Sequence, residues 1–291
     1  MSQKRVGIAS TKKGNETDAV FLIDEPGASL HAKAQEDVLR VLEDIKDDVQ
    51  IIYTSHSPYL LSLDKLYRIL AVQRVTERDE KSDTIILETH NLASAAPDTL
   101  TPIYTHMGIA LYHQQVIKAK NNVILEEISA YYYLSSFSKL ANFQKEKSFL
   151  PVKGVTQVPK LAYLLLGWGL DFISIVDDDP SGRKIYKELK RNLYGDDEKK
   201  ASKKCIKIKD CHGIEDLFSK NDFKKYILES KVSEKIDSNA QYLKKRNLSK
   251  PILALNFKRK VDEGNIAFTD FSIETQKKIK RLLDSLDNSL E

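Results

Sequence analysis

Three consecutive aspartates are the first candidates for chemistry in this chain. Asp177, Asp178 and Asp179 follow the apolar, β-branched run 172–176 and lead into a Pro-Ser-Gly turn. If that run is a buried parallel strand, it delivers Asp177 and Asp179 to the carboxyl end of a sheet, where open α/β sheets bind ligands. Clustered carboxylates repel one another unless a cation such as Mg²⁺ neutralises them. The alternative is an acidic turn without a ligand, because these residue types also favour turns.

Two further apolar segments near the N-terminus end in residues suited to phosphate chemistry. Residues 20–26 form an apolar strand that ends in Asp24 and Glu25, and residues 51–54 run on to His56. Hydrolysis of a phosphoanhydride needs a positioned water, a general base and positive charge near the leaving oxygens. These residue types fit that chemistry. The alternative is a pair of core strands with solvated acidic ends.

The same two segments resemble the second half of an ATP-binding cassette (ABC-type) ATPase. The resemblance implies that Asp24 helps to hold Mg²⁺, that Glu25 polarises the attacking water and that His56 contacts the γ-phosphate. The sequence has no Gly-x-x-x-x-Gly-Lys-Ser/Thr loop to cradle the phosphates. We therefore expect that this chain alone does not hydrolyse ATP. The first half of the ATPase is expected to lie upstream, to come from another polypeptide or to have been lost.

The composition suits a two-domain protein of the cytoplasm. The chain has 291 residues, of which 41% are hydrophobic and 30% charged, with a formal net charge of +4. This length allows about two separate cores, and the mildly basic charge permits nucleic-acid binding without requiring it. No apolar stretch is long enough to cross a bilayer, and no signal peptide is evident, so we expect no membrane partner. Cys205 and Cys211 are expected to be reduced thiols.

We predict an α/β protein with the C-terminal part of an ABC-type ATPase domain at residues 1–90, a connector at 91–118 and a second domain at 119–291. The second domain alternates strands with helices, which predicts a parallel sheet, and it ends in a helical extension. In the first domain the expected strands are 20–24, 50–54, 67–75 and 84–88, with a helix at 32–46. In the second domain the expected strands are 122–125, 149–152, 172–176 and 205–208, with helices around 159–167 and 183–193.

A glutamate at the end of one strand and an Asp-x-Asp pair at the end of another form the pattern of the Toprim fold. A cassette ATPase followed by Toprim resembles the OLD (overcoming lysogenization defect) family of ATP-dependent endonucleases, including the nuclease subunit of the Gabija antiphage system. The resemblance implies carboxylates that bind Mg²⁺ or Mn²⁺ for DNA cleavage, and a basic residue late in the domain. The matching carboxylates and the matching basic residue are Glu126, Asp177, Asp179, Glu215, Asp216 and Lys250.

The chain departs from the family pattern just after Glu126. Where the family reads Glu-Gly-x-x-Asp, this chain has Glu127 in place of the glycine and Ala130 in place of the aspartate. Glu127 is near enough to replace part of the missing carboxylate, but neighbouring side chains at a strand end are expected to point to opposite faces. A weak, one-metal or degenerate nuclease therefore stays open.

We predict a divalent-metal-dependent DNA endonuclease that is controlled by an ATPase module and acts in antiphage defence. Its expected partners are DNA, further copies of the chain in a homo-oligomer, and a partner protein or the upstream ATPase half. ATP is expected as a ligand only where that half is supplied. The alternatives are a non-catalytic assembly or sensor protein with a degenerate Toprim domain, and a DNA-repair ATPase.

Overall fold

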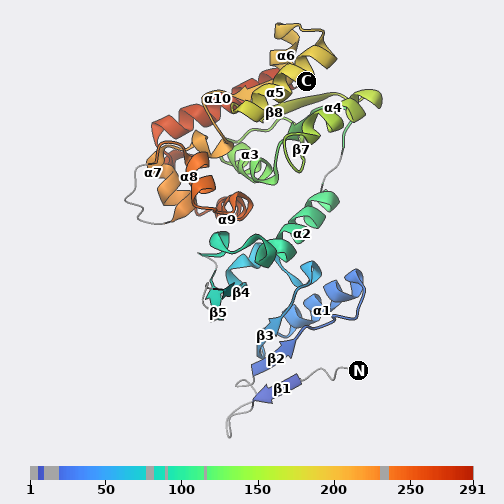
Figure 1. The fold of residues 1–291 in the computed structure, drawn as a ribbon, viewed down its shortest axis with the longest axis vertical. Helices are drawn as coiled ribbons and strands as arrows, with labels where there is room; N and C mark the ends of the chain where they lie inside the picture. Colours follow the sequence, from blue (N-terminus) through green and yellow to red (C-terminus); the bar gives the residue numbers. More distant parts are fainter. Residues whose placement is uncertain are drawn as a thin grey trace. The chain divides into compact units, whose positions relative to one another are not determined.

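The computed structural model describes residues 6–9, 20–76, 82–88, 91–114, 117–229 and 236–290 (Figure 1). It is an α/β protein that divides into two compact units. The first unit contains residues 1–86 and 96–114, and the second contains 87–95 and 115–291. The segment predicted as a connector, 91–118, is thus shared between the units. The predicted boundary at residue 90 lies outside the described residues.

A small sheet and one helix form the part of the first unit that carries candidate residues. Strand β1 (Val6–Ala9) pairs antiparallel with β2 (Val20–Asp24), which pairs in parallel with β3 (Gln50–Thr54). Parallel neighbours need a crossover connection, and helix α1 (Ala32–Asp44) supplies it. His31 caps the helix, because its ring Nδ1 accepts a hydrogen bond from a first-turn backbone N–H at 3.2 Å. Both predicted strands and the helix between them are confirmed.

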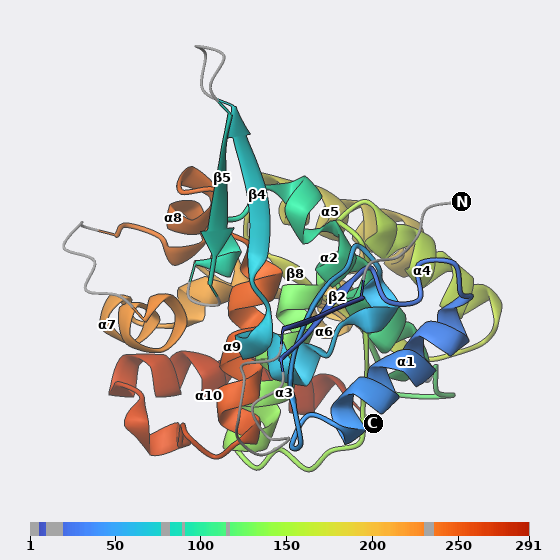
Figure 2. The ribbon, with the colours of Figure 1, turned by 90° about the horizontal axis from the view of Figure 1, so that it is seen from below.

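The remainder of the first unit is a two-stranded sheet and a long helix. Strand β4 (Ala71–Thr76) pairs with β5 (Ser82–Leu87), and the pair forms a narrow ribbon in Figure 2. Helix α2 (Pro97–Gln114) has 18 residues and lies within the segment predicted as a connector. Pro102 lies inside this helix. Since proline has no backbone N–H, one helical hydrogen bond is missing at that point.

The second unit is built on a parallel sheet with the strand order β7-β6-β8-β9, and every pairing in it is parallel, as predicted. Its strands are β6 (Asn122–Leu125), β7 (Ser148–Pro151), β8 (Phe172–Asp177) and β9 (Cys205–Ile208). Its helices are α3 (Ile128–Leu140), α4 (Gln157–Gly167), α5 (Pro180–Tyr194), α6 (Glu198–Lys204), α7 (Lys220–Asp222), α8 (Asn239–Lys245), α9 (Lys250–Asp262) and α10 (Ile273–Ser289).

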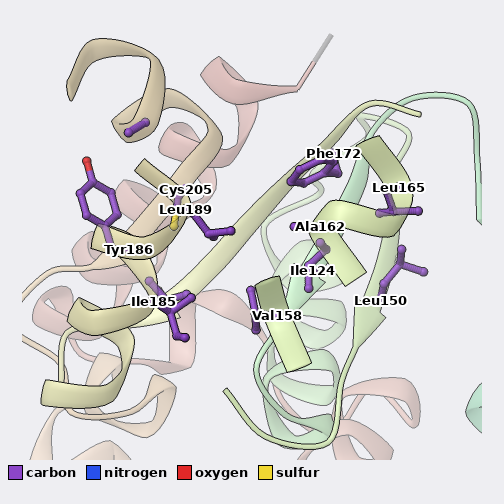
Figure 3. Close-up of a cluster of buried hydrophobic side chains, with 12 residues drawn as sticks. Ile124, Leu150, Val158, Ala162, Leu165, Phe172, Ile185, Tyr186, Leu189 and Cys205 are labelled. Atoms are coloured by element: carbon purple, nitrogen blue, oxygen red, sulfur yellow. The ribbon is translucent and has the colours of Figure 1, made fainter. Parts of the chain in front are cut away.

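Helices α4 and α5 cover one face of this sheet through an apolar core (Figure 3). Ile124 of β6 and Phe172 of β8 point into this core, where they meet Val158 of α4 and Leu189 of α5. Burying each such side chain contributes about 1.5–3 kcal/mol, which makes this layer a rigid support for the strands. Strands β6, β8 and β9 are therefore held in a fixed register.

An aromatic cluster attaches α3 to α9 and so positions the start of α9. Tyr133 and Phe137 of α3 pack against Phe257 of α9 and against Phe218, with the Tyr133 and Phe257 ring centroids 5.6 Å apart. Tyr133 is fully buried, so its role is packing.

Two general expectations about the chain can be compared with the structure. Cys205 and Cys211 are both free and buried. Within the described ranges, every helix is too short or too polar to cross a membrane.

Candidate functional site

The main candidate site lies at the carboxyl ends of β6 and β8, which are neighbours in the sheet. After β6 the chain returns through α3 to β7 on one side, whereas after β8 it runs through α5 and α6 to β9 on the other. The connections diverge at this point, and ligands bind at such switch points in open α/β sheets. Glu126 follows β6 directly and Asp177 ends β8. The topology therefore brings together two acids that are 51 residues apart in the sequence.

Glu126 and Asp177 are joined by a hydrogen bond, and the ionised form of both carboxyl groups is disfavoured. The backbone N–H of Asp177 donates to Oε1 of Glu126 at 2.8 Å. Burial raises the pKa of Glu126 to about 7, and the charges of Asp179 and Glu127 raise it as well. Burial also raises the pKa of Asp177 well above its usual range, with further contributions from Glu126 and Glu215. A cation beside this pair would relieve both effects.

The rest of the aspartate triplet supports the turn and the next helix. Asp179 is the N-cap of α5, and its Oδ1 accepts a hydrogen bond from the backbone N–H of Gly182 at 2.7 Å. Asp178 forms an ion pair at 3.0 Å with the arginine that follows Gly182. Asp179 nevertheless lies near enough to Glu126 to raise the pKa of that residue. The predicted pair Asp177 and Asp179 is thus in one place, but a helix cap already occupies one oxygen of Asp179.

Gly182 is a site residue that the sequence analysis treated only as part of a turn. A Cβ atom there would lie 2.1 Å from the carbonyl oxygen of Asp177 and 3.2 Å from Oε1 of Glu126. Only glycine lets the first turn of α5 come this close to the end of β8. The spacing of this glycine three residues after the Asp179 cap was the available signal.

Lys250 lies between two glutamates. It is the first residue of α9, and its Nζ is 3.3 Å from Oε1 of Glu127 and 3.5 Å from Oε2 of Glu215. Burial by itself lowers the pKa of Lys250. The nearby charges of Glu215, Glu127 and Asp177 outweigh burial and raise the pKa above its ordinary value. The ammonium group is therefore a permanent cation at neutral pH.

Glu215 is fully buried beside this lysine, on the 3₁₀ turn Ile214–Leu217. Neither of its side-chain oxygens has a hydrogen-bond partner among the described residues. Burial raises its pKa above the ordinary value even though the charge of Lys250 acts in the opposite direction. A Cβ atom at Gly213 would lie 2.7 Å from Oε2 of Glu215 and 3.3 Å from Nζ of Lys250. Gly213, which the sequence analysis did not identify, thus leaves room for the two charges to meet.

The expectation that Glu127 points away from the other acids is wrong. Its side chain contacts Lys250, and its charge raises the pKa values of Glu126, Asp177 and Glu215. The reason is that β6 already ends at Leu125 and that Glu127 is the N-cap of α3. Strand alternation therefore no longer applies at this position.

Asp216 has a structural role that differs from the predicted metal ligand. Its Oδ2 accepts hydrogen bonds from the backbone N–H of His212 at 3.0 Å and from the Ser238 hydroxyl at 2.9 Å. Its Oδ1 accepts the backbone N–H of Asn239 at 2.6 Å. Both oxygens thus tie the 3₁₀ turn to the start of α8, and we leave Asp216 out of the candidate site.

Glu126 and Asp177 are the remaining candidates for binding a hard cation, with water as its other ligands. Across the described residues, no group of three or more His, Cys, Asp or Glu side chains is placed so that it could hold a metal ion. Mg²⁺ needs less than that, because it usually keeps several waters and binds one or two carboxylates. Lys250 already lies 3.5 Å from Glu215, whereas the mutual repulsion of Glu126 and Asp177 indicates a need for further positive charge. The donor set therefore suits Mg²⁺ or Mn²⁺.

The second candidate site lies at the carboxyl ends of β2 and β3 in the first unit. The Thr54 hydroxyl donates to Oδ1 of Asp24 at 2.5 Å, and the backbone N–H of His56 donates to Oε2 of Glu25 at 3.4 Å. Nε2 of His56 is 3.6 Å from Oε1 of Glu25, and the His56 side chain is 96% exposed. The structure thus brings the three predicted residues together, with the imidazole open to an incoming group.

Gln35 was missed by the sequence analysis although it organises this second site. It is buried on α1, and its amide donates to the carbonyl oxygens of Gly27 and Leu30 at 3.0 and 3.1 Å. Its Oε1 accepts a hydrogen bond from the Ser57 hydroxyl. Gln35 therefore links the loop after β2 to the loop after β3, which carries His56.

The comparisons with known proteins each cover a short part of the chain. Residues 4–62 match the family described as "AAA domain, putative AbiEii toxin, Type IV TA system". A stretch of 61 residues is 36% identical to "Uncharacterized protein MJECL43" of Methanocaldococcus jannaschii and covers 21% of this chain and 16% of that protein. The chain thus spans only a small part of this relative. The N-terminus is similar to an AAA-type ATPase domain.

Proposed function

We propose that this chain is a divalent-metal-dependent DNA endonuclease of the OLD type, controlled by an ATPase module and acting in antiphage defence. One observation carries the proposal. Glu126 and Asp177 meet at the switch point of a parallel sheet, and buried Glu215 and the charged Lys250 lie beside them. A set of buried carboxylates with raised pKa values is typical of a site that handles charge during a reaction.

Each residue of the cluster has a distinct role in the proposed reaction. Glu126 and Asp177 hold the cation, and Asp179 keeps α5 in place while adding negative charge near Glu126. A bound Mg²⁺ or Mn²⁺ supplies an activated water and offsets the charge of the phosphate. Lys250 keeps its proton and stabilises the negative charge that grows on the phosphate as water attacks.

The N-terminal unit is the proposed control module. Asp24, Glu25 and His56 form the part of a nucleotide site that acts on Mg²⁺, water and phosphate. ATP binding at this site requires a phosphate-cradling loop in addition to these residues. The name of the matching family refers to a putative toxin and a Type IV TA system, which supports a defence role.

Plasmid nicking tests the nuclease directly. The purified chain is incubated with supercoiled DNA and Mg²⁺ or Mn²⁺, beside the variants Asp177→Asn and Asp284→Asn. Both substitutions turn a carboxylate into an amide, but Asp284 is exposed on α10 and has no place in the cluster. We expect nicking by the wild type and by Asp284→Asn, and none by Asp177→Asn. If Asp177→Asn cuts as fast as Asp284→Asn, the proposed active site is wrong.

A second candidate function is a non-catalytic assembly protein, and one observation favours it. Leu22 of β2 and Ile52 of β3 are register partners, and they are 46% and 52% exposed. They form an apolar strip on one face of the small sheet, which another polypeptide would cover. If the chain is such an assembly protein, a calorimetric titration detects no Mn²⁺ binding, and the chain still forms a complex with another polypeptide.

A further inference from the structure

The place of Lys250 within the acidic cluster determines how many cations the cluster needs. Besides Asp179, which caps α5 and adds negative charge near Glu126, four carboxylates belong to it, and Lys250 is the cation found among them in the described part of the chain. The members are Glu126, Glu127, Asp177 and Glu215. The ammonium group contacts Glu127 and Glu215, so among the described residues Glu126 and Asp177 have no cation in direct contact, although the charge of Lys250 acts on both from further away.

The position of Lys250 is built into the fold and is not an accident of a mobile side chain. The side chain is only 25% exposed and starts at the first residue of α9. A cation is unfavourable at a helix N-terminus because the helix dipole is positive there. The contacts with Glu127 and Glu215 offset this cost. The backbone at Gly213 also leaves no room for a Cβ atom beside the two charges.

We propose that the site takes one divalent ion and that Lys250 supplies the second positive charge. The ion belongs to Glu126 and Asp177. Glu127, which replaces the glycine of the family pattern, is a positioning residue that holds Lys250 with the help of Glu215. This inference rests on the proposed nuclease function and defines its metal stoichiometry.

The chemistry needs only these two positive charges. In hydrolysis the oxygen of a water forms a bond to phosphorus, and the bond from phosphorus to one sugar oxygen breaks. The bonding electron pair leaves with that sugar oxygen, and the proton lost by the water ends on it. Lys250 neither gains nor loses a proton in this exchange; it donates a hydrogen bond to an oxygen that becomes more negative.

Counting Mn²⁺ ions tests the inference without relying on cleavage. Mn²⁺ is titrated calorimetrically without nucleotide into an Asp24→Asn background, which removes the candidate metal ligand of the first unit. The electron paramagnetic resonance spectrum is recorded in parallel. We expect one ion per chain and the hyperfine spectrum of an isolated Mn²⁺. Two ions with a spin-coupled spectrum would overturn the inference and leave the proposed nuclease intact. No binding at all would overturn both.

Variants at Lys250 test its role as the second cation. Lys250→Met frees Glu127 and Glu215, so we expect a second Mn²⁺ to bind. Lys250→Arg keeps the charge and should keep one ion per chain, which provides a folded control if the methionine variant proves unstable. The assignment fails if Lys250→Met binds a single ion with wild-type affinity, or if Lys250→Arg binds two.

The variant Glu127→Gln tests whether Glu127 positions Lys250 or binds the metal ion. We expect Mn²⁺ affinity to stay within twofold of the wild type and the cleavage rate to fall about tenfold or more, as removal of an outer-shell partner typically causes. Glu127→Asp, which keeps the charge, should recover part of the rate. A loss of Mn²⁺ affinity in Glu127→Gln would make Glu127 a ligand and refute its assignment as a positioning residue.

Discussion

Replacing Glu126 with glutamine should stabilise the metal-free protein, and the gain should depend on pH. The pKa of Glu126 is about 7 in the folded protein, against an ordinary value of 4.5. Each pKa unit corresponds to about 1.4 kcal/mol, so the ionised carboxylate costs about 3 kcal/mol of the free energy of unfolding. Glutamine removes the charge and still offers an oxygen to the backbone N–H of Asp177.

Proton binding by Glu126 determines whether the stability of the wild type rises or falls with pH. Between pH 4.5 and about 7 the unfolded chain releases the Glu126 proton while the folded chain retains it, so the wild type loses stability as pH rises through this window. Below pH 4.5 both states are protonated and the difference from Glu126→Gln vanishes. Above about pH 7 the full difference of about 3 kcal/mol should be present.

Urea unfolding in EDTA at pH 4 and pH 8.5 measures this difference. Trp168 is the single tryptophan of the chain and follows α4, so its fluorescence reports on the second unit. The control is Asp284→Asn, an exposed carboxylate-to-amide change in the same unit. If Glu126→Gln is no more stable than the wild type at pH 8.5, the ionised Glu126 carboxylate does not destabilise the metal-free protein, and the reasoning is refuted.

Other predictions concern the residues around this pair. Gly182→Ala should destabilise the second unit by about 1–3 kcal/mol and abolish nicking, because the added methyl displaces the carbonyl of Asp177; unfolding followed at Trp168 and plasmid nicking check both effects. Asp216→Asn should cost about 1–3 kcal/mol of stability through its lost hydrogen bonds and leave Mn²⁺ affinity unchanged; weaker Mn²⁺ binding at full stability would restore it as a ligand. Saturating Mg²⁺ at pH 8 should raise the Tm of the wild type, and a thermal melt should show a smaller rise for Glu126→Gln.

The secondary structure of the second unit could be predicted because its strands are short apolar runs that end in acids or turn residues. β8 and the start of α5 are an example. An apolar run, an Asp N-cap and a proline in the first helical turn identify the boundary within a few residues. Glu126 and Asp177 followed from the same pattern, because adjacent parallel strands bring their carboxyl ends together.

The parts of the site that were missed depend on partners far away in the chain. Glu127 contacts Lys250, which is 123 residues further on, and no local pattern indicates that contact. Asp216 and Glu215 look equivalent in the sequence, yet one binds backbone N–H groups and the other faces a lysine. Tertiary packing alone distinguishes them. Gly213 also could not be identified from the sequence, because its role depends on Glu215 and Lys250, which lie beside it in the fold.

The late position of Lys250 in the chain has a consequence for synthesis. A ribosome makes all four carboxylates of the cluster before it makes α9, so the nascent second unit carries a set of acids with no lysine to offset them. The cluster becomes balanced only when α9 docks on α3 through its aromatic contacts. Completion of the proposed cutting site is thereby delayed until α9 has been made.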